Sequence, residues 1–135
     1  MKKTLLTITF IVISFIQTSA QCMLSPVLLT QRIQNSGNVI EGKVINQLSF
    51  WDPAHTNIFT SNLIEVYKSF KNTSPVYLEI VTEGGTVGND KEDVHPSLEL
   101  SVGDIGVFTL NTNSLPSQFG KPVYEAYASS QGFIK

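Results

Sequence analysis

The stretch VIEGKVINQL, residues 39–48, decides the fold class, because its side chains alternate with a period of two. Successive side chains of a β-strand point to opposite faces, so this alternation predicts a strand with one buried face. The expected inner face carries Ile40, Gly42, Val44, Asn46 and Leu48, and the expected outer face carries Glu41, Lys43 and Gln47.

The same alternation returns in two later stretches, which are predicted strands. Residues 63–70 place Ile64, Val66 and Phe70 on one face, and residues 76–83 place Val76, Leu78 and Ile80 opposite Tyr77, Glu79 and Glu83. We expect Glu79 and Glu83 to lie on a solvated strand face. Shorter strands are predicted at residues 105–110 and, as a pair, at 123–128 and 132–134. Residues 97–100 fit either a short strand or a single turn.

Five or six short strands predict an all-β fold with a minor α component: an OB-like antiparallel barrel, closed or nearly closed. Closure of such a barrel removes exposed strand edges. The glycines of residues 84–88 predict a turn or bulge after the third strand, because glycine adopts backbone conformations that other residues avoid. One short N-terminal helix is predicted within residues 25–34, with Ser25 as its cap and Pro26 in its first turn. It is expected to pack across one end of the barrel.

The first twenty residues have the pattern of a secretory signal peptide. Lys2 and Lys3 precede an apolar stretch at residues 5–16, and small residues end at Ala20. The apolar stretch is shorter than the roughly 20 residues of a membrane-spanning helix. We therefore expect export to the periplasm or the medium, with no membrane span, and a single β domain at residues 21–135.

Composition argues against several classes of protein and site. Charged side chains make up 15% of the chain and the formal net charge is -2, unlike a basic nucleic-acid-binding protein or an acidic disordered tail. The single cysteine, Cys22, forms neither an internal disulfide nor a cysteine-rich zinc site. Ser19 and Gln21 disfavour lipid attachment at Cys22, so it is interpreted as a free thiol, with an intermolecular disulfide as the alternative.

Residues 50–60, between the first two strands, hold the densest group of unusual side chains. Trp51, Asp52, His55 and Asn57 are the candidate ligand-binding residues of this loop, joined by Gly84 and Gly85 in a recognition edge. Loop aromatics bury a large area on a partner at little entropic cost. The alternative is structural: Trp51 folds back over the barrel mouth, and Asp52 opens an Asx turn.

Neither catalysis nor metal binding is predicted. His55 and His95 are the two histidines, and they and the nearby acids lack a diagnostic metal-ligand spacing. No Gly-x-Ser-x-Gly motif is present, and Cys22 lies too near a terminus to be held rigidly against a base. We expect no catalytic residue, no metal and no cofactor.

Six motifs lie between residues 39 and 110: VIEGKV, FWD with His55, IFT, EVYKSFK, EGGTVG and GDIGVF. Together they resemble a β domain near the N-terminus of large secreted proteins of the flavobacterial kind, some of which carry metalloprotease or adhesion modules and a type IX sorting domain. The resemblance implies an exported, non-catalytic binding or accessory module with a protein or glycan ligand at the cell surface. Residues 132–134 are similar to the start of that domain's final strand, so we expect the domain to be truncated at residue 135.

A cysteine near the mature start, followed by strands of the VIxGKV and VYKxFK types, is similar to the netrin-like OB fold of the tissue inhibitors of metalloproteinases. In those inhibitors the amine and carbonyl of the terminal cysteine bind the zinc of the target. This second resemblance implies an alternative function, a metalloprotease-directed inhibitor or pro-segment, with residues 21–26 entering the cleft of a metalloprotease.

Overall fold

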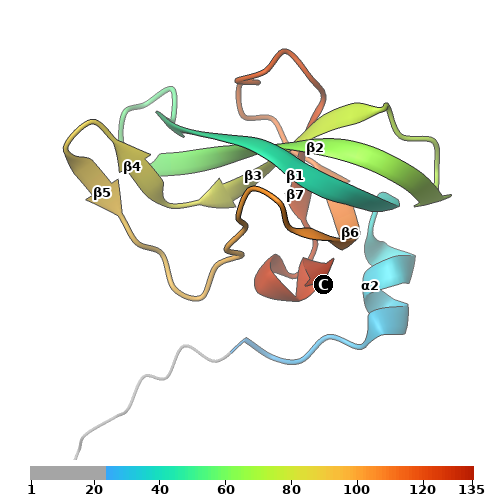
Figure 1. Ribbon diagram of the computed structural model, residues 1–135. Coiled ribbons are helices and arrows are strands. Elements are labelled where there is room, and N and C mark those ends of the chain that lie inside the picture. The colour runs from blue at the N-terminus through green and yellow to red at the C-terminus, as the bar shows by residue number, and fades with distance from the viewer. Residues whose placement is uncertain (1–23) are drawn as a thin grey trace, which may run out of the picture.

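The computed structural model describes residues 24–135, drawn in colour in Figure 1. The predicted signal peptide and Cys22 lie outside the described residues. The elements follow in the order α2 (Leu29–Asn35), β1 (Asn38–Trp51), β2 (Ile58–Lys71), β3 (Tyr77–Glu83), β4 (Gly85–Val87), β5 (Asp90–Glu92), β6 (Ile105–Thr112), β7 (Val123–Ala126), the 3-10 helix η1 (Ser129–Gly132) and β8 (Phe133–Ile134).

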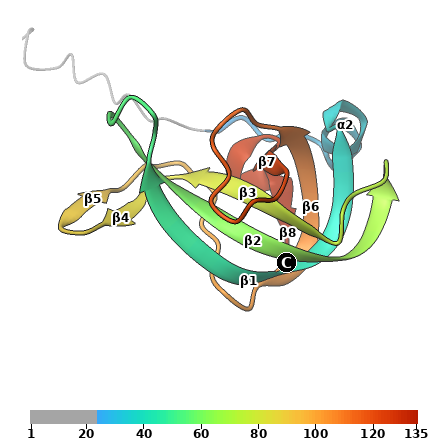
Figure 2. The same ribbon diagram turned by 90° about the horizontal axis from the view of Figure 1, so that it is seen from above.

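The main sheet closes into a barrel, as Figures 1 and 2 show. Its order is β1-β2-β3-β7-β6, β6 returns to pair with β1, and β8 adds to β6 as an extra strand. The predicted all-β, OB-like barrel is confirmed. The antiparallel prediction is wrong for one pair, because β3 and β7 run parallel. The predicted pairing of the last two strands is also wrong, since both pair with β6.

The barrel interior is filled by aliphatic and aromatic side chains from four strands. Its buried core consists of Ile40, Val44, Ile64, Leu78, Ile80, Phe108 and Leu110. Burial of each such side chain contributes about 1.5 to 3 kcal/mol relative to exposure. Phe133 of β8 stacks on Phe108 with ring centroids 4.6 Å apart, so the extra strand extends the core of the barrel.

β-Bulges in β1 change which face some side chains occupy, so the predicted strand faces are wrong beyond them. The register of β1 against β2 shifts between Val44 and Asn46, and beyond this point Gln47 pairs with Asn62. A bulge adds one residue, so the side chains beyond it change faces. Leu48, predicted inside, is 47% exposed, whereas Gln47, predicted outside, is half-buried. A second shift, between Glu41 and Gly42, precedes Phe70 of the partner strand, which is 53% exposed.

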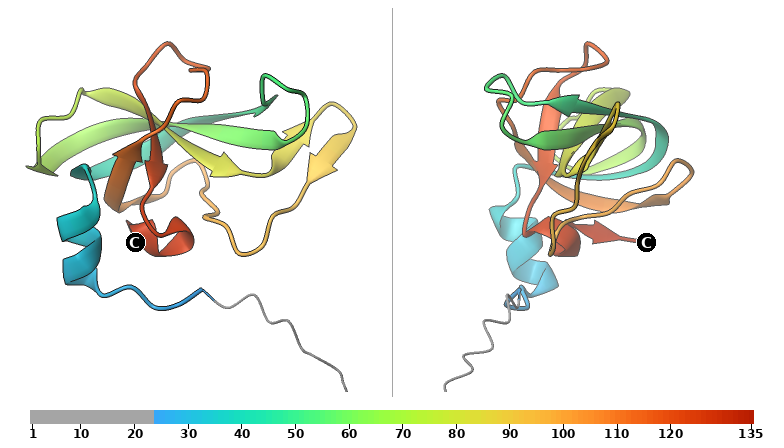
Figure 3. Two further views of the ribbon diagram at one scale, coloured as in Figure 1. Left: turned by 180° about the vertical axis from the view of Figure 1, so that it is seen from behind. Right: turned by 90° about the vertical axis from the view of Figure 1, so that its left-hand side faces the viewer.

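Helix α2 is shorter than predicted, and its first turn is different. It begins at Leu29 rather than near Ser25, its N-cap Leu28 makes no side-chain hydrogen bond, and none of its residues is buried. Polar contacts hold it instead: Lys71 Nζ donates to the carbonyls of Ile33, Gln34 and Ser36 at 2.6–2.8 Å. Figure 3 shows α2 near one end of the barrel and the β4–β5 hairpin at the other.

The loop between β6 and β7, residues 113–122, folds over the outer face of β3, as Figure 2 shows from above. Beneath it Glu79 has no exposed surface, so its predicted solvated position is wrong. Its carboxylate accepts hydrogen bonds from the Ser61 and Ser117 hydroxyls and from the backbone N–H groups of Gln118, Phe119 and Lys121. Alternation alone misplaced this residue because its cover comes from a segment about forty positions away.

Candidate functional site

The β1–β2 loop, residues 52–57, is organised around the Asp52 carboxylate. Asp52 accepts hydrogen bonds from the backbone N–H groups of Thr56 (2.7 Å) and Asn57 (3.3 Å) and from the Thr56 hydroxyl (2.8 Å). The Thr56 N–H is the largest of the causes that lower the pKa of Asp52. Asp52 therefore orders the loop, but through N–H groups four and five residues on rather than through the two-residue spacing of the predicted Asx turn.

Trp51 and His55 lie against each other at the edge of this loop. Their ring centroids are 6.0 Å apart and the rings are tilted by 32°. His55 is exposed and has a positive φ of 53°. Trp51 is half-buried. Its exposure is therefore intermediate between the two alternatives, full projection from the loop and burial in the barrel mouth.

Gly84 and Gly85 lie next to this loop, although some thirty residues separate them from it. The Gly84 N–H donates to the Ile58 carbonyl and the Thr60 hydroxyl donates to the Gly84 carbonyl, each at 2.8 Å. The Ile58 N–H donates to the Glu92 carboxylate at 2.5 Å. The segment predicted as a turn forms the β4–β5 hairpin, and this hairpin and the loop share one end of the barrel (Figure 3).

A cleft of about 690 Å³ opens beside the hairpin. On one side lie polar side chains of the main strands, which we call the cleft floor: Gln47, Ser49, Thr60 and Thr82. On the other side runs the strap, residues 93–101, which contains neither a helix nor a strand. Residues 97–100 therefore form neither the short strand nor the single turn that was expected. Gly84 and Gly85 line the cleft, whereas Trp51, Asp52, His55 and Asn57 lie outside its lining.

The cleft floor is fixed by hydrogen bonds. Gln47 Nε2 donates to Asn62 Oδ1 at 2.6 Å and to the Leu100 carbonyl of the strap at 2.7 Å. The hydroxyls of Ser49 and Thr60 are 2.9 Å apart. Gln47 was missed in the sequence because the bulge after Val44 reverses the faces of β1. Thr60 and Asn62 were missed because the second strand was predicted to begin at residue 63, whereas β2 begins at Ile58. The available signal was the polar residues at alternate strand positions 47, 49, 60, 62 and 82.

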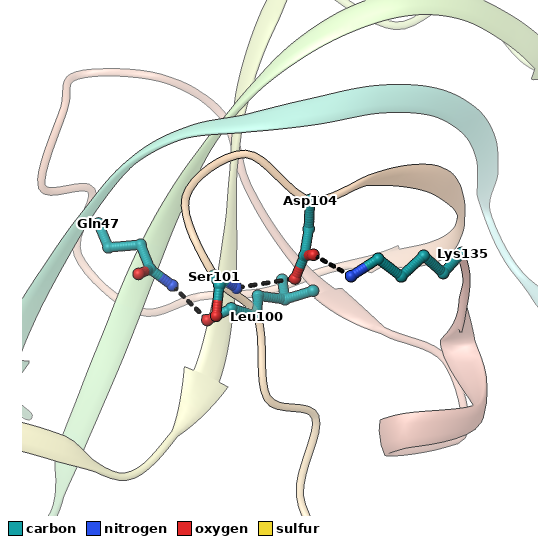
Figure 4. Close-up of polar contacts among 5 residues, drawn as sticks. All are labelled: Gln47, Leu100, Ser101, Asp104 and Lys135. Carbon is teal, nitrogen blue, oxygen red and sulfur yellow. Dashed lines mark hydrogen bonds and ion pairs between the residues drawn. The ribbon is translucent and has the colours of Figure 1, made fainter.

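The end of the strap is anchored by a second set of contacts, drawn in Figure 4. Asp104 accepts a hydrogen bond from the Ser101 N–H at 2.9 Å and pairs with Lys135 Nζ at 2.6 Å. The contact with Lys135, followed by that with Ser101, lowers the pKa of Asp104. The strap is thus attached to β1 through Gln47 and to the last residue through Asp104.

The rim of the cleft carries more negative than positive charge. Its ionisable side chains are Glu83, Glu92, Asp93 and Glu99 against Lys91 and His95. Lys91 pairs with Asp93 at 2.8 Å, a contact that raises the pKa of Lys91, and His95 Nδ1 lies 3.9 Å from Glu99. The cleft therefore combines neutral hydrogen-bonding groups on its floor with an acidic rim.

OB-fold barrels bind ligands on the outer face of their second and third strands. Here the β6–β7 loop covers Ser61 and Glu79 on that face, so the open cleft lies elsewhere. Among residues 24–135, no three His, Cys, Asp or Glu side chains lie close enough together to hold a metal ion. Within the same residues, no helix is long and apolar enough to cross a membrane.

Comparison with known proteins gives no match for this chain, whether with protein-family models, with curated proteins or with solved structures.

Proposed function

We propose that this chain is exported and acts as a non-catalytic binding or accessory module for a protein or glycan at the cell surface. Its recognition edge comprises Trp51 at the end of β1, with Asp52, His55 and Asn57 of the β1–β2 loop and Gly84 and Gly85 at the start of the neighbouring hairpin. The observation that carries the proposal is the set of hydrogen bonds joining Ile58 and Thr60 to Gly84 and Glu92. They hold the two segments side by side, with Gly84 buried at their junction and Gly85 partly exposed.

A loop that is already ordered loses little conformational entropy when it binds a partner. Asp52 supplies that order through its hydrogen bonds to residues 56 and 57. The aromatic pair of Trp51 and His55 supplies flat, partly exposed area of the kind that stacks on sugars or on partner side chains. The signal-peptide pattern and the resemblance to domains of large secreted proteins support the exported location.

The test replaces Trp51 by alanine and measures binding to a defined array of polysaccharides and cell-envelope polymers, with urea unfolding in parallel. Tyr67→Ala is the matched control, because Tyr67 is an exposed aromatic residue of β2 outside this edge. Trp51→Ala should weaken binding by about tenfold or more and Tyr67→Ala should not. If Trp51→Ala instead costs more than about 3 kcal/mol of stability, Trp51 belongs to the core and the proposed anchor is wrong.

The alternative function, inhibition of a metalloprotease by residues 21–26, has one observation in its favour. Gln131 holds the described end of this segment: its Oε1 accepts from the Val27 N–H at 2.7 Å and its Nε2 donates to the Ser25 carbonyl at 3.0 Å. These contacts fix Ser25 and Val27 against Gln131. A chain starting at Gln21 should then inhibit a zinc metalloprotease in a peptide-cleavage assay, and Gln131→Ala should weaken the inhibition. Absence of inhibition across a panel of these enzymes excludes this alternative.

A further inference from the structure

Strand β1 pairs with β2 along one edge and with the shorter β6 along the other, which we call its outer edge. β2 pairs with β1 from Val39 to Trp51, whereas β6 pairs with it only from Asn38 to Lys43. The backbone of Val44 is hydrogen-bonded to the backbone of Gly103 and Asp104, which follow the strap. Beyond that point no strand among residues 24–135 pairs with the outer edge of residues 46–51.

The ladder fixes which backbone groups face this open edge. The Ile58 carbonyl accepts the Gly84 N–H on the β3 side, so the backbone groups of Ile58 point away from β1. Trp51 lies opposite Ile58 in the ladder, so these two residues form a pair without mutual hydrogen bonds. The N–H and C=O of Trp51 therefore point to the open edge. By alternation the same holds for Ser49 and Gln47. The Gln47 N–H donates to Asn46 Oδ1 at 2.8 Å. The N–H groups of Ser49 and Trp51 are therefore the ones on this edge that a further strand could use.

The open edge borders the cleft at Gln47 and Ser49, which line it, and continues past the cleft to Trp51. The strap, which is not a strand, forms the opposite side. Five residues of extended chain, at about 3.3 Å each, match the length of residues 47–51. Unpaired strand edges are templates for another strand, and main-chain hydrogen bonds supply affinity when an extended peptide adds to such an edge.

We propose that the cleft binds an extended polypeptide segment containing lysine or arginine, which adds to residues 47–51 of β1 as a further strand. This inference rests on the proposed binding function and names the class of partner. The acidic rim favours a partner that carries positive charge. Its acidic side chains, Glu83, Glu92, Asp93 and Glu99, outnumber Lys91 and His95. Opposite charges along a binding surface steer association and exclude like-charged partners.

The experiment begins with a display library of random linear dodecapeptides selected on the folded chain. The tightest peptide is synthesised in two N-methylated forms, one for each set of alternate amides. Strand addition uses one set, so one form should lose about tenfold or more in affinity and the other should lose little. Equal effects of the two forms would overturn strand addition.

Variants of the chain test the same edge from the other side. Ser49→Pro removes an edge-facing N–H, while Ser49→Ala keeps it and removes only the hydroxyl. Proline should weaken binding of the selected peptide about tenfold or more relative to Ser49→Ala, because both variants lack the hydroxyl and only proline also lacks the N–H. Circular dichroism checks the fold of each variant, and if Ser49→Pro fails to fold, the two N-methylated peptides decide the question with the unaltered chain.

The charge of the partner is tested separately. The double variant Glu83→Gln with Glu99→Gln should weaken binding several-fold, whereas Glu41→Gln, on β1 outside the cleft, is the control. Selected peptides rich in acidic residues, or an affinity unchanged in the double variant, would contradict the basic partner.

Glycan binding that depends on Trp51 but not on Ser49 would overturn this inference and leave the proposed function intact. Absence of binding to either ligand class would overturn both.

Discussion

Glu79 of β3 and Ser61 of β2 share a hydrogen bond of 2.7 Å between two side chains that have no exposed surface. The same carboxylate accepts from Ser117 and from three backbone N–H groups of the β6–β7 loop. One residue on the outside of the barrel thus attaches a ten-residue loop to β3.

Replacement of Glu79 by glutamine should therefore destabilise the fold. Glutamine presents an NH₂ group where the carboxylate accepts, so at least one buried donor loses its partner, at a cost of about 1.5 to 3 kcal/mol. Urea unfolding followed by circular dichroism measures the loss. Glu83→Gln is the control, because Glu83 ends the same strand and is exposed. A loss no larger than that of the control would show that the loop is held by other contacts.

Lowering the pH should remove the stability that the Glu79 carboxylate contributes. Burial by itself raises the pKa of Glu79, but hydrogen bonds from Ser117, Ser61 and the backbone of Gln118 and Lys121 outweigh it and lower the pKa overall. A lowered folded-state pKa contributes stability that is full above the unfolded value, roughly 4.3, and is lost as the pH falls through the folded value.

Unfolding curves measured from pH 7 to pH 2.5 test this sign. The stability difference between the unaltered chain and Glu79→Gln should be largest near pH 7 and should shrink below about pH 4. A difference that grows on acidification would mean that the folded-state pKa of Glu79 is raised.

The hairpin beside the cleft should not tolerate a side chain at Gly85. A Cβ at this position would stand 2.5 Å from Ser49 Oγ and close to Thr60 Oγ1, and the φ of +143° is unfavourable for other residues. Gly85→Ala should cost about 2 kcal/mol or more. Gly88→Asn is the control, since no atom would lie within 4 Å of its Cβ and asparagine accepts positive φ. Thermal melting of both variants compares the two sites.

The strap should loosen when Gln47 is shortened. Gln47→Ala removes the donor to Leu100 and leaves Asn62 Oδ1 without that partner, a cost of about 1 to 3 kcal/mol. Hydrogen exchange measured by mass spectrometry should accelerate in residues 93–104. Leu48→Ala, one position away on the exposed side of β1, should leave exchange in the strap unchanged. Unaltered exchange in Gln47→Ala would show that the contacts of Gly103 and Asp104 with Val44 and Lys135 hold the strap without Gln47.

The sequence alone was sufficient for the fold class and for the approximate positions of the main strands. Alternation at residues 39–48, 63–70 and 76–83 is a local property, because each side chain's face depends on its neighbours in the same strand. The recognition edge was also proposed from local composition, and the structure places its two segments side by side through Gly84 and Ile58.

Tertiary structure alone decided the faces beyond the bulges, the parallel pairing of β3 with β7, and the cover over Glu79. A bulge is set by how two strands fit together, so one strand's sequence could not show that Gln47 turns inward while Leu48 turns outward. The cleft floor likewise unites residues 47, 49, 60 and 82 with a strap from residues 93–101. Which polar groups face one another across such a cleft depends on the closure of the barrel, and closure joins segments far apart in the chain.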